Sequence, residues 1–510
     1  MLRPQFRMNW FPPRPLGTRI PDRLHAVSCS LPTMRDVVGY EKKDSATVAQ
    51  MSSGYPRFVV HPLLTAIAVE WRQRFALGTD ALWMVSSRRM GERLIAHLAA
   101  ATARVVTDDG ICAVAHADEV ELRKQARSFL QHTGGFLSSR EAEDYAVRHA
   151  LLAHADIEDT FPGDAAAEVR RHCARLLGLD LPGNILLAPS GMNAFWATFQ
   201  AVGAQQRRHG RDVWLQVGWL YLDTAAILTK FTGGRIVRIF DVNDHAAIAA
   251  VFREYGPRLA AVVTEVTTNP LMHTADVPWL AALARQHGAM LVVDPSLSSI
   301  FNVDVLPYAD VVLNSLTKYA APAGDVIAGA VAIAPHCPDA AAVRDAIAAE
   351  LEPIYPRDLA RLARQIGEFE TLVPQLNAAA QVVIDHLAQR RRGVRRVCWS
   401  LQAQTRANYL RLARGPDRIG PVFSFEIDGD TERFFDALPL AKGPSFGMRT
   451  TLICPFVYLA HYDLISTPEG REVLAGAQLT PELLRLSIGT EPPDAIIAAL
   501  ETGFAAAGLA

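Results

Sequence analysis

The stretch that decides the fold runs from residue 289 to residue 331 and reads AMLVVDPSLSSIFNVDVLPYADVVLNSLTKYAAPAGDVIAGAV. It contains three apolar runs of strand length, separated by segments rich in Pro, Asp and Ser. The first run ends in Asp294, and the second leads into Ser315, Thr317 and Lys318. An acid and an amine that follow neighbouring parallel strands are expected to meet at one edge of a sheet, where open α/β folds carry their chemistry.

The same pattern continues upstream of this stretch. Short apolar runs alternate with helical stretches such as DVPWLAALARQHG. This alternation predicts an α/β protein whose mostly parallel sheet is covered by helices on both faces. The upstream runs are NILLAPS (184–190), DVWLQV (212–217), GRIVRIF (234–240) and LAAVVTEV (259–266).

The pattern changes along the chain and predicts several segments. A beginning rich in Pro, Arg and Ser indicates an extended arm that needs another surface to order it. A mainly helical segment with two short strands follows, then the alternating region, then long helices with a few strands. The expected segments are an N-terminal arm (1–60), an inserted small α/β segment (61–160), a large α/β domain (161–344) and a smaller α+β domain (345–510).

Composition excludes several classes of protein. The chain has 510 residues, of which 50% are hydrophobic and 20% charged, with a net charge of −2. Such a balance argues against a nucleic-acid partner. No apolar run reaches membrane-spanning length, and the opening lacks the apolar core of a secretion signal, so we expect a cytoplasmic protein. The six cysteines form no CxxC or Cys/His spacing, so we expect neither a metal nor disulfides.

The residues at the strand ends suggest a particular cofactor. A buried acid such as Asp294 needs a cationic partner, and a desolvated amine such as Lys318 can form a Schiff base with an aldehyde. Pyridoxal 5'-phosphate satisfies both, because its ring nitrogen binds an acid while a lysine carries its aldehyde. Its phosphate would suit the helix start at Gly191 and Met192, with the hydroxyls of Ser315 and Thr317 nearby.

Each of these signals has an ordinary alternative. An Asp after a strand is commonly a loop or N-cap residue, a Ser-Gly before a helix is commonly only a cap, and a Lys in a turn is commonly solvated. The interpretation therefore depends on the ordered set of residues, not on any one of them.

That ordered set resembles a known family. The region from Leu291 to Val331 is similar to the lysine region of the cystathionine γ-synthase family, which are fold type I pyridoxal phosphate enzymes of Cys and Met metabolism. Two N-terminal stretches resemble the long form of the family known from fungi. Matching motifs, in family order, are SLPTMRDVVGYE (30–41), GYPRF (54–58), SGM (190–192), WLYLDT (219–224), TTNP (267–270), PSFG (444–447) and LRLSIGTE (484–491).

The resemblance implies roles for individual residues around the cofactor. Lys318 would be the Schiff-base lysine and proton carrier, and Asp294 would contact the pyridinium nitrogen. Tyr221 would stack on the ring and assist proton transfer, and Asn269 would lie near the phenolic oxygen.

The resemblance also implies how substrate and subunits are held. Arg485 would clamp the substrate carboxylate, and Ser445 would help to position Lys318 or the substrate. Tyr55 and Arg57 match a pair that reaches the phosphate in a neighbouring subunit. A homodimer or homotetramer with shared active sites is therefore expected.

The reaction implied by the resemblance is γ-replacement. An O-acylated homoserine would lose its γ substituent, and the thiol of cysteine would take its place to give cystathionine. Two alternatives on the same scaffold are γ-elimination and γ-substitution by another nucleophile in a specialised pathway. A catalytically idle regulatory paralogue is the alternative from a different class.

Three departures from the family pattern bear on specificity. The chain has YLDT where the family commonly has a Gly-rich turn, and AAPAGD after the lysine. We expect Asp223 and Pro322, in these two stretches, to change the shape and charge of the pocket floor. The inserted segment is longer than in the short form; we expect it to serve packing, with coverage of the site as the alternative.

Overall fold

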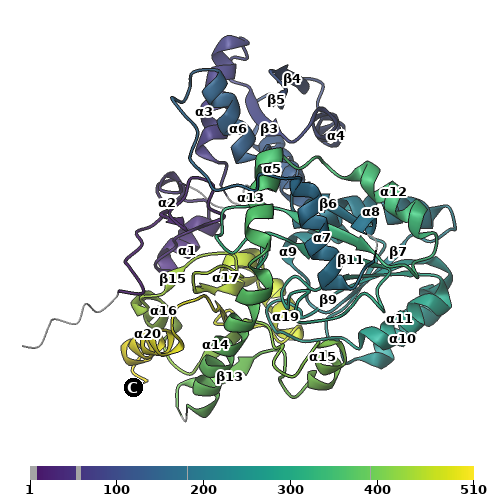
Figure 1. Ribbon diagram of the computed structural model, residues 1–510, viewed down its shortest axis with the longest axis vertical. Coiled ribbons are helices and arrows are strands. Elements are labelled where there is room, and N and C mark those ends of the chain that lie inside the picture. The colour runs from purple at the N-terminus through teal and green to yellow at the C-terminus, as the bar shows by residue number, and fades with distance from the viewer. Residues whose placement is uncertain (1–8, 53–58, 181, 391, 510) are drawn as a thin grey trace, which may run out of the picture.

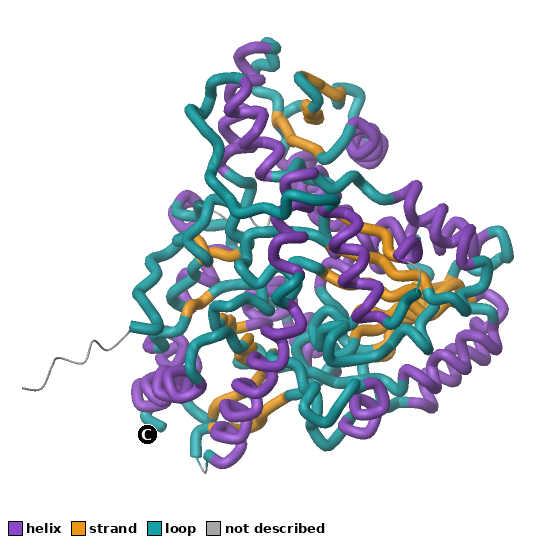
Figure 2. The backbone as a smooth tube through the Cα atoms, in the orientation of Figure 1, coloured by secondary structure: helices purple, strands orange, loops and turns teal. Residues whose placement is uncertain are grey.

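The computed structural model describes residues 9–52, 59–180, 182–390 and 392–509. Figures 1 and 2 show three layered regions, each built around its own sheet. The largest sheet has seven strands, a second sheet has five, and a third has three; a two-stranded ribbon lies in the N-terminal part.

The seven-stranded sheet forms the centre of the molecule. Its strand order is β6-β12-β11-β10-β9-β7-β8, and within it only β12 runs antiparallel to its neighbours. The α/β architecture with a mostly parallel sheet is thereby confirmed. The strands are β6 (Ile185–Ala188), β7 (Val213–Val217), β8 (Ile236–Ile239), β9 (Leu259–Glu265), β10 (Met290–Asp294), β11 (Val311–Ser315) and β12 (Gly329–Ile333).

Helices cover both faces of this sheet, as Figure 1 shows. Helices α8 and α12 lie on one face, and α10 and α11 lie on the other. The central strands are Val- and Leu-rich and almost completely buried, as expected of strands covered on both sides. The helices of this region are α7 (Ala165–Leu177), α8 (Gly191–Arg207), α9 (Leu222–Phe231), α10 (His245–Tyr255), α11 (Val277–His287) and α12 (Ala340–Glu350).

The C-terminal region is α+β, as its sequence pattern indicates. Its sheet has the order β13-β14-β17-β16-β15, with only the β15–β16 pair parallel. The strands are β13 (Val394–Cys398), β14 (Val422–Ile427), β15 (Ala441–Lys442), β16 (Leu452–Pro455) and β17 (Leu484–Ser487). The helices are α13 (Pro356–Ile366), α14 (Phe369–Gln389), α15 (Arg406–Leu412), α16 (Thr431–Ala437), α17 (Phe456–Ala460), α18 (Tyr462–Ile465), α19 (Pro468–Gly476) and α20 (Pro493–Ala506).

The inserted segment folds around its own antiparallel sheet, β3-β5-β4. Two small hydrophobic cores fill the segment, one around Trp71 and one around Leu94. Strand β5 was not expected, because a fully buried run of six residues carries no alternation to mark it. The elements are α3 (Pro62–Arg74), β3 (Ala81–Val85), α4 (Arg88–Leu98), β4 (Arg104–Asp108), β5 (Ile111–His116), α5 (Val120–Thr133) and α6 (Ser139–Arg148).

The described part of the N-terminal arm is not simply extended, in contrast to the expectation. It forms β1 (Arg19–Ile20), β2 (Ser28–Cys29), α1 (Met34–Glu41) and α2 (Ser45–Ala49). Thr33 and Asp36 form a capping box that starts α1. The arm packs on the C-terminal region of its own chain, where the Leu31 N–H donates to the Lys442 carbonyl at 2.9 Å. Tyr55 and Arg57 lie outside the described residues.

The inserted segment is fixed to the large sheet at the start of α8. The side-chain amide N–H of Asn193 donates to the Thr133 carbonyl at 3.0 Å. The Asn193 Oδ1 atom accepts a hydrogen bond from the Glu352 N–H at 2.9 Å. Gly134 follows with φ +64°, and a Cβ there would lie 2.4 Å from Ser190 Oγ. Only glycine allows this left-handed turn at such a close approach.

Replacing Gly134 with alanine tests this attachment. Gly178 provides a matched control, because it ends α7 in the same left-handed conformation with nothing within 4 Å of a Cβ. We expect Gly178→Ala to cost about 1 kcal/mol, the usual penalty of a left-handed residue, and Gly134→Ala to cost clearly more. Thermal and urea unfolding measure both, and equal losses would contradict the close packing of the insert on α8.

Across the described residues, none of the helices combines the length and apolar character needed to cross a membrane.

Candidate active site

A large cavity opens at the carboxyl ends of β9, β10 and β11. It brings together residues that are far apart in the sequence and come from the sheet, the C-terminal region and the inserted segment. Every predicted site residue within the described part of the chain lines this cavity. These residues are Gly191, Met192, Tyr221, Asn269, Asp294, Ser315, Thr317, Lys318, Ser445 and Arg485.

Lys318 lies just beyond the end of β11 and is 8% exposed. Its amine donates a hydrogen bond to Ser445 Oγ at 2.8 Å and lies 4.8 Å from the centre of the Phe446 ring. Ser445 has φ +91°, a strained conformation for a residue other than glycine. The strain presents the Ser445 hydroxyl to Lys318.

Arg485 enters the cavity from β17 and is bound to the same Ser445. Its guanidinium donates to the Ser445 carbonyl at 3.2 Å and to Asn269 Oδ1 at 3.1 Å, and lies over the rings of Phe446 and Phe456. Among the described residues Arg485 contacts no carboxylate. A buried guanidinium held by neutral groups can accept a carboxylate from a ligand as a bidentate fork.

Two acids end neighbouring strands of the large sheet. Asp294 closes β10, and Glu265 lies opposite it at the end of β9. Burial raises the pKa of Asp294 to about 6, although the Ser296 N–H donates to its carboxylate at 2.8 Å. Burial and the negative charge of Asp294 raise the pKa of Glu265 well above its usual range. The pair therefore favours one negative charge and one proton, and a cationic group beside Asp294 would stabilise that charge.

Glu265 is a cavity residue that our sequence reasoning missed. Its carboxylate accepts a hydrogen bond from the backbone N–H of Tyr221 at 2.6 Å, which holds the backbone at the start of α9. The signal was present, since Glu265 closes an apolar strand in the same way as Asp294 does.

The start of α8 forms a small cradle beside the end of β11. A Cβ on Gly191 would lie 3.0 Å from Ser315 Cβ, so only glycine leaves this space open. Ser190 caps α8 by accepting from the Asn193 N–H. The Thr317 hydroxyl is used within the chain, because it accepts from the Ala328 N–H and donates to the Ala328 carbonyl. The helix start and Ser315 are thus left to hold an anion.

The expectation for Asp223 and Pro322 was wrong. Asp223 is fully buried below the cavity wall, where it accepts hydrogen bonds from Gln131 at 2.9 Å and from His132 at 3.1 Å. The Pro322 carbonyl accepts from the Arg449 N–H, and neither residue lines the cavity. The YLDT stretch attaches α9 to the inserted segment, because a buried carboxylate requires such partners.

The expectation that the inserted segment serves only packing was also wrong. Its residues between Gly134 and Glu141, together with Ser86 and Gln131, form part of the cavity wall. Sequence periodicity could not show this, because these residues occupy a loop and a helix start whose position depends on packing against α8 and α13.

Glu141 is the most unusual acid on this wall. Burial, together with the negative charge of Asp358, raises the pKa of Glu141 from its usual value of 4.5 to about 7. The acid is therefore protonated in the folded chain at pH values where it is ionised in the unfolded chain. Stability that depends on the protonated form is present below about pH 4.5 and is lost as the pH rises to about 7.

The variant Glu141→Gln tests this shift because glutamine cannot ionise. We expect the thermal midpoint of the variant relative to the wild type to rise between about pH 4.5 and pH 7, and to stay level above. Glu472→Gln, on the exposed face of α19, serves as the control. A difference for Glu141→Gln that does not vary with pH would contradict the shifted pKa.

Comparison with known proteins gives the class of protein. A family model described as Cys/Met metabolism PLP-dependent enzyme matches residues 174–505. The chain is 36% identical to L-2-amino-4-chloropent-4-enoate dechlorinase/desaturase of Streptantibioticus cattleyicolor, over 97% of this chain and 98% of the relative. It is 25% identical to cystathionine gamma-synthase of Neurospora crassa, over 95% of this chain and 97% of that relative.

Solved structures agree on the fold. Cystathionine gamma synthase from Xanthomonas oryzae pv. oryzae has a TM-score of 0.58 at 24% identity, over 68% of this chain and 87% of that chain. Cystathionine gamma-lyase from yeast has a TM-score of 0.58 at 20% identity, over 71% of this chain and 95% of that chain. The chain therefore belongs to the pyridoxal phosphate-dependent enzymes of Cys and Met metabolism, as the sequence resemblance implied.

The cavity fits this family's cofactor, pyridoxal 5'-phosphate. Asp294 has no cationic partner among the described residues, and the cradle at Gly191 is open to an anion. Lys318 has its amine on the same cavity wall. When bound, the cofactor supplies an aldehyde that a lysine can hold and a ring that withdraws electrons. In the described residues, no group of three or more His, Cys, Asp or Glu side chains is arranged to hold a metal.

Proposed function

We propose that this enzyme removes a γ substituent from an L-2-amino acid by elimination, without an added thiol. The single observation that carries the proposal is that Arg485 is, among the described residues, the one cavity arginine free of a carboxylate partner. The other arginine on the wall, Arg140, is bound to Glu158 and Asp358. This guanidinium can bind the carboxylate of one amino-acid substrate, and elimination needs no second amino acid, whereas γ-replacement by cysteine does.

The bacterial relative supports the same proposal. Its name describes loss of chlorine from an amino acid, and the similarity extends over nearly the whole of both chains. Loss of HCl from such a substrate leaves one further unsaturated bond, because the chloride leaves Cγ with its electron pair while a neighbouring carbon gives up a proton. No oxidant is needed.

The residues of the chain would divide this work among them. Arg485 would bind the substrate carboxylate, and Lys318 would hold the cofactor and then move a proton at the substrate Cα. Ser445, bound to both residues, would keep them in register. Tyr221, held by Glu265, would cover one side of the site and exclude water.

γ-Replacement with cysteine is the second candidate function. The similarity to cystathionine gamma-synthase of Neurospora crassa and the PSFG and LRLSIGTE motifs favour it. Subunit association also belongs to the proposal: Tyr55 and Arg57 match the family pair that reaches a neighbour's phosphate, so we propose a homodimer or homotetramer with shared sites.

An assay with two substrate pairs separates the two functions. We expect L-2-amino-4-chloropent-4-enoate to release chloride without a thiol, and cysteine not to change the rate. O-Succinyl-L-homoserine with cysteine should give little cystathionine. Cystathionine as the main product would overturn elimination in favour of replacement. If the enzyme binds the cofactor but shows neither activity, both candidate functions are overturned.

Chemical trapping tests the role of Lys318. We expect the purified protein to show a visible absorption band that borohydride abolishes, leaving the cofactor mass on the peptide that contains Lys318. Lys318→Ala should bind the cofactor without forming this link, because no amine remains to attack the aldehyde. Attachment to another lysine, measured by mass spectrometry, would exclude Lys318 from this role.

A further inference from the structure

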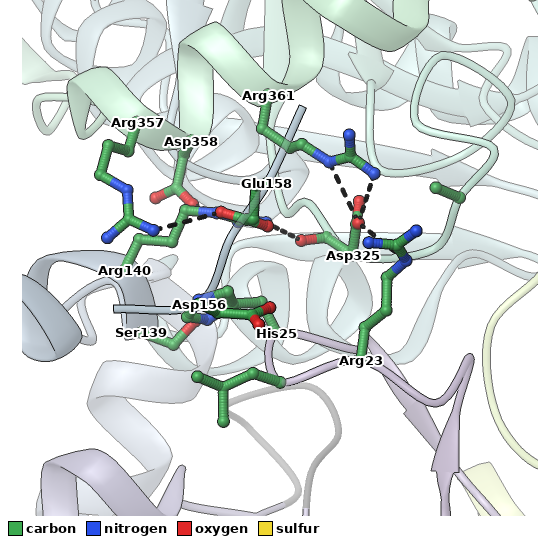
Figure 3. A network of polar contacts seen from close by, with 12 residues as sticks. Arg23, His25, Ser139, Arg140, Asp156, Glu158, Asp325, Arg357, Asp358 and Arg361 are labelled. Atoms are coloured by element: carbon green, nitrogen blue, oxygen red, sulfur yellow. Dashed lines mark hydrogen bonds and ion pairs between the residues drawn. The ribbon is translucent and has the colours of Figure 1, made fainter. Parts of the chain in front are cut away.

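Figure 3 shows a network of ion pairs and hydrogen bonds, and several of its residues, including Arg140, Asp325 and Asp358, also line the cavity. It joins four parts of the chain that are distant in sequence. These are the arm (Arg23, His25), the inserted segment (Ser139, Arg140, Glu143, Asp144, Asp156, Glu158), the loop that follows Lys318 (Asp325), and α13 (Arg357, Asp358, Arg361).

Arg140 is the centre of this network. Its side chain is 1% exposed, and its guanidinium donates four hydrogen bonds to three different residues. Two nitrogens bind Glu158 at 2.6 and 2.7 Å, and a third binds Asp358 at 2.7 Å. One of the Glu158-binding nitrogens also donates to the Asp325 carbonyl at 2.9 Å. Only an arginine has the planar fork that satisfies all of these directions at once.

Asp325 lies on the loop between Lys318 and β12, which we call the post-lysine loop (319–328). Its carboxylate is completely buried and accepts from Arg361 at 2.8 and 3.1 Å and from Gln365 at 2.7 Å. Burial opposes the charge of Asp325, but the hydrogen bonds and positive charge of Arg361 hold its pKa below the usual range. The carboxylate is therefore fixed by α13, while its backbone carbonyl is fixed by Arg140.

The post-lysine loop transmits this fixation to the lysine. Ala328, three residues beyond Asp325, exchanges hydrogen bonds with Thr317, the neighbour of Lys318. Gly324 accepts from the Val27 N–H of the arm, and Ala323 donates to the side chain of Gln365. Each of these contacts restrains the loop. Among the hydrogen bonds of the described residues, the one from Arg140 is the only one that joins the loop to the inserted segment.

We propose that Arg140 is a positioning residue for Lys318, which ties the placement of the inserted segment over the cavity to the backbone that carries the cofactor lysine. The inserted segment is then a part of the cofactor site and not only a wall of it. The inference depends on Lys318 as the cofactor lysine and not on the identity of the substrate. A negative result here would leave the proposed elimination intact, and a failure of the proposed elimination would leave this inference intact.

The variant pair Arg140→Lys and Arg357→Lys tests this proposal in the holoenzyme. Both keep the positive charge and lose one guanidinium from the same network. Arg357 binds Glu143, Asp144 and Glu158 but makes no hydrogen bond to the post-lysine loop. A loss of network stability alone should therefore affect both variants. An effect on Lys318 should appear only in Arg140→Lys.

Two readouts report on Lys318 independently of turnover. The first is the rate at which the cofactor leaves the holoenzyme on dilution, and the second is the pH midpoint of its visible absorption. We expect Arg140→Lys to release the cofactor about tenfold faster and to shift the midpoint, and Arg357→Lys to change the rate less than about twofold. Equal changes in both variants, or none in Arg140→Lys, would overturn the proposal.

A third variant keeps the test valid if Arg140→Lys does not fold. Glu158→Gln retains Arg140 but weakens the two-pronged contact that orients the Arg140 guanidinium within the inserted segment. We expect faster cofactor release in this variant as well, at a thermal midpoint similar to that of Arg357→Lys. Unchanged release from a folded Glu158→Gln protein would overturn the role of Arg140.

Discussion

The structure depends on one constraint, the burial of charge at the carboxyl end of a parallel sheet. Strands β9 and β10 end in Glu265 and Asp294, side by side and largely withdrawn from solvent. Burial raises the pKa of both carboxylates, so the pair favours one proton and one negative charge, which a cation beside Asp294 would stabilise. The ring nitrogen of this family's cofactor would supply that cation. Lys318, Ser445 and Arg485 line the same cavity and are joined by hydrogen bonds.

Charge burial also explains the parts that surround the large sheet. The inserted segment reaches α9 through Asp223, and it reaches the post-lysine loop and α13 through Arg140. Isolated buried ions are costly, but paired ions with all their hydrogen bonds made accept only one geometry. The network therefore contributes less to net stability than to fixing where the inserted segment lies over the cavity.

Much of the fold and the centre of the site could be predicted from the sequence. The alternation of apolar runs and helices defines the parallel sheet, and strand ends meet at one edge in any such sheet, so Asp294, Ser315 and Lys318 were expected together. Glu265 carries the same signal. Arg485 and Ser445 could be predicted only by resemblance, because they come from the C-terminal region, more than a hundred residues away from Lys318.

The sequence by itself determined the class of fold, the strand-end residues and, by resemblance, the cofactor, because these follow from local periodicity and from fixed motifs. Only the tertiary structure decided the roles of Asp223, Glu141, Arg140 and Asp325. Their partners come from other parts of the chain, and burial changes their charge and pKa only after those parts have packed together. The inserted segment forms part of the active-site wall for the same reason: its position is set by long-range ion pairs that no local pattern records.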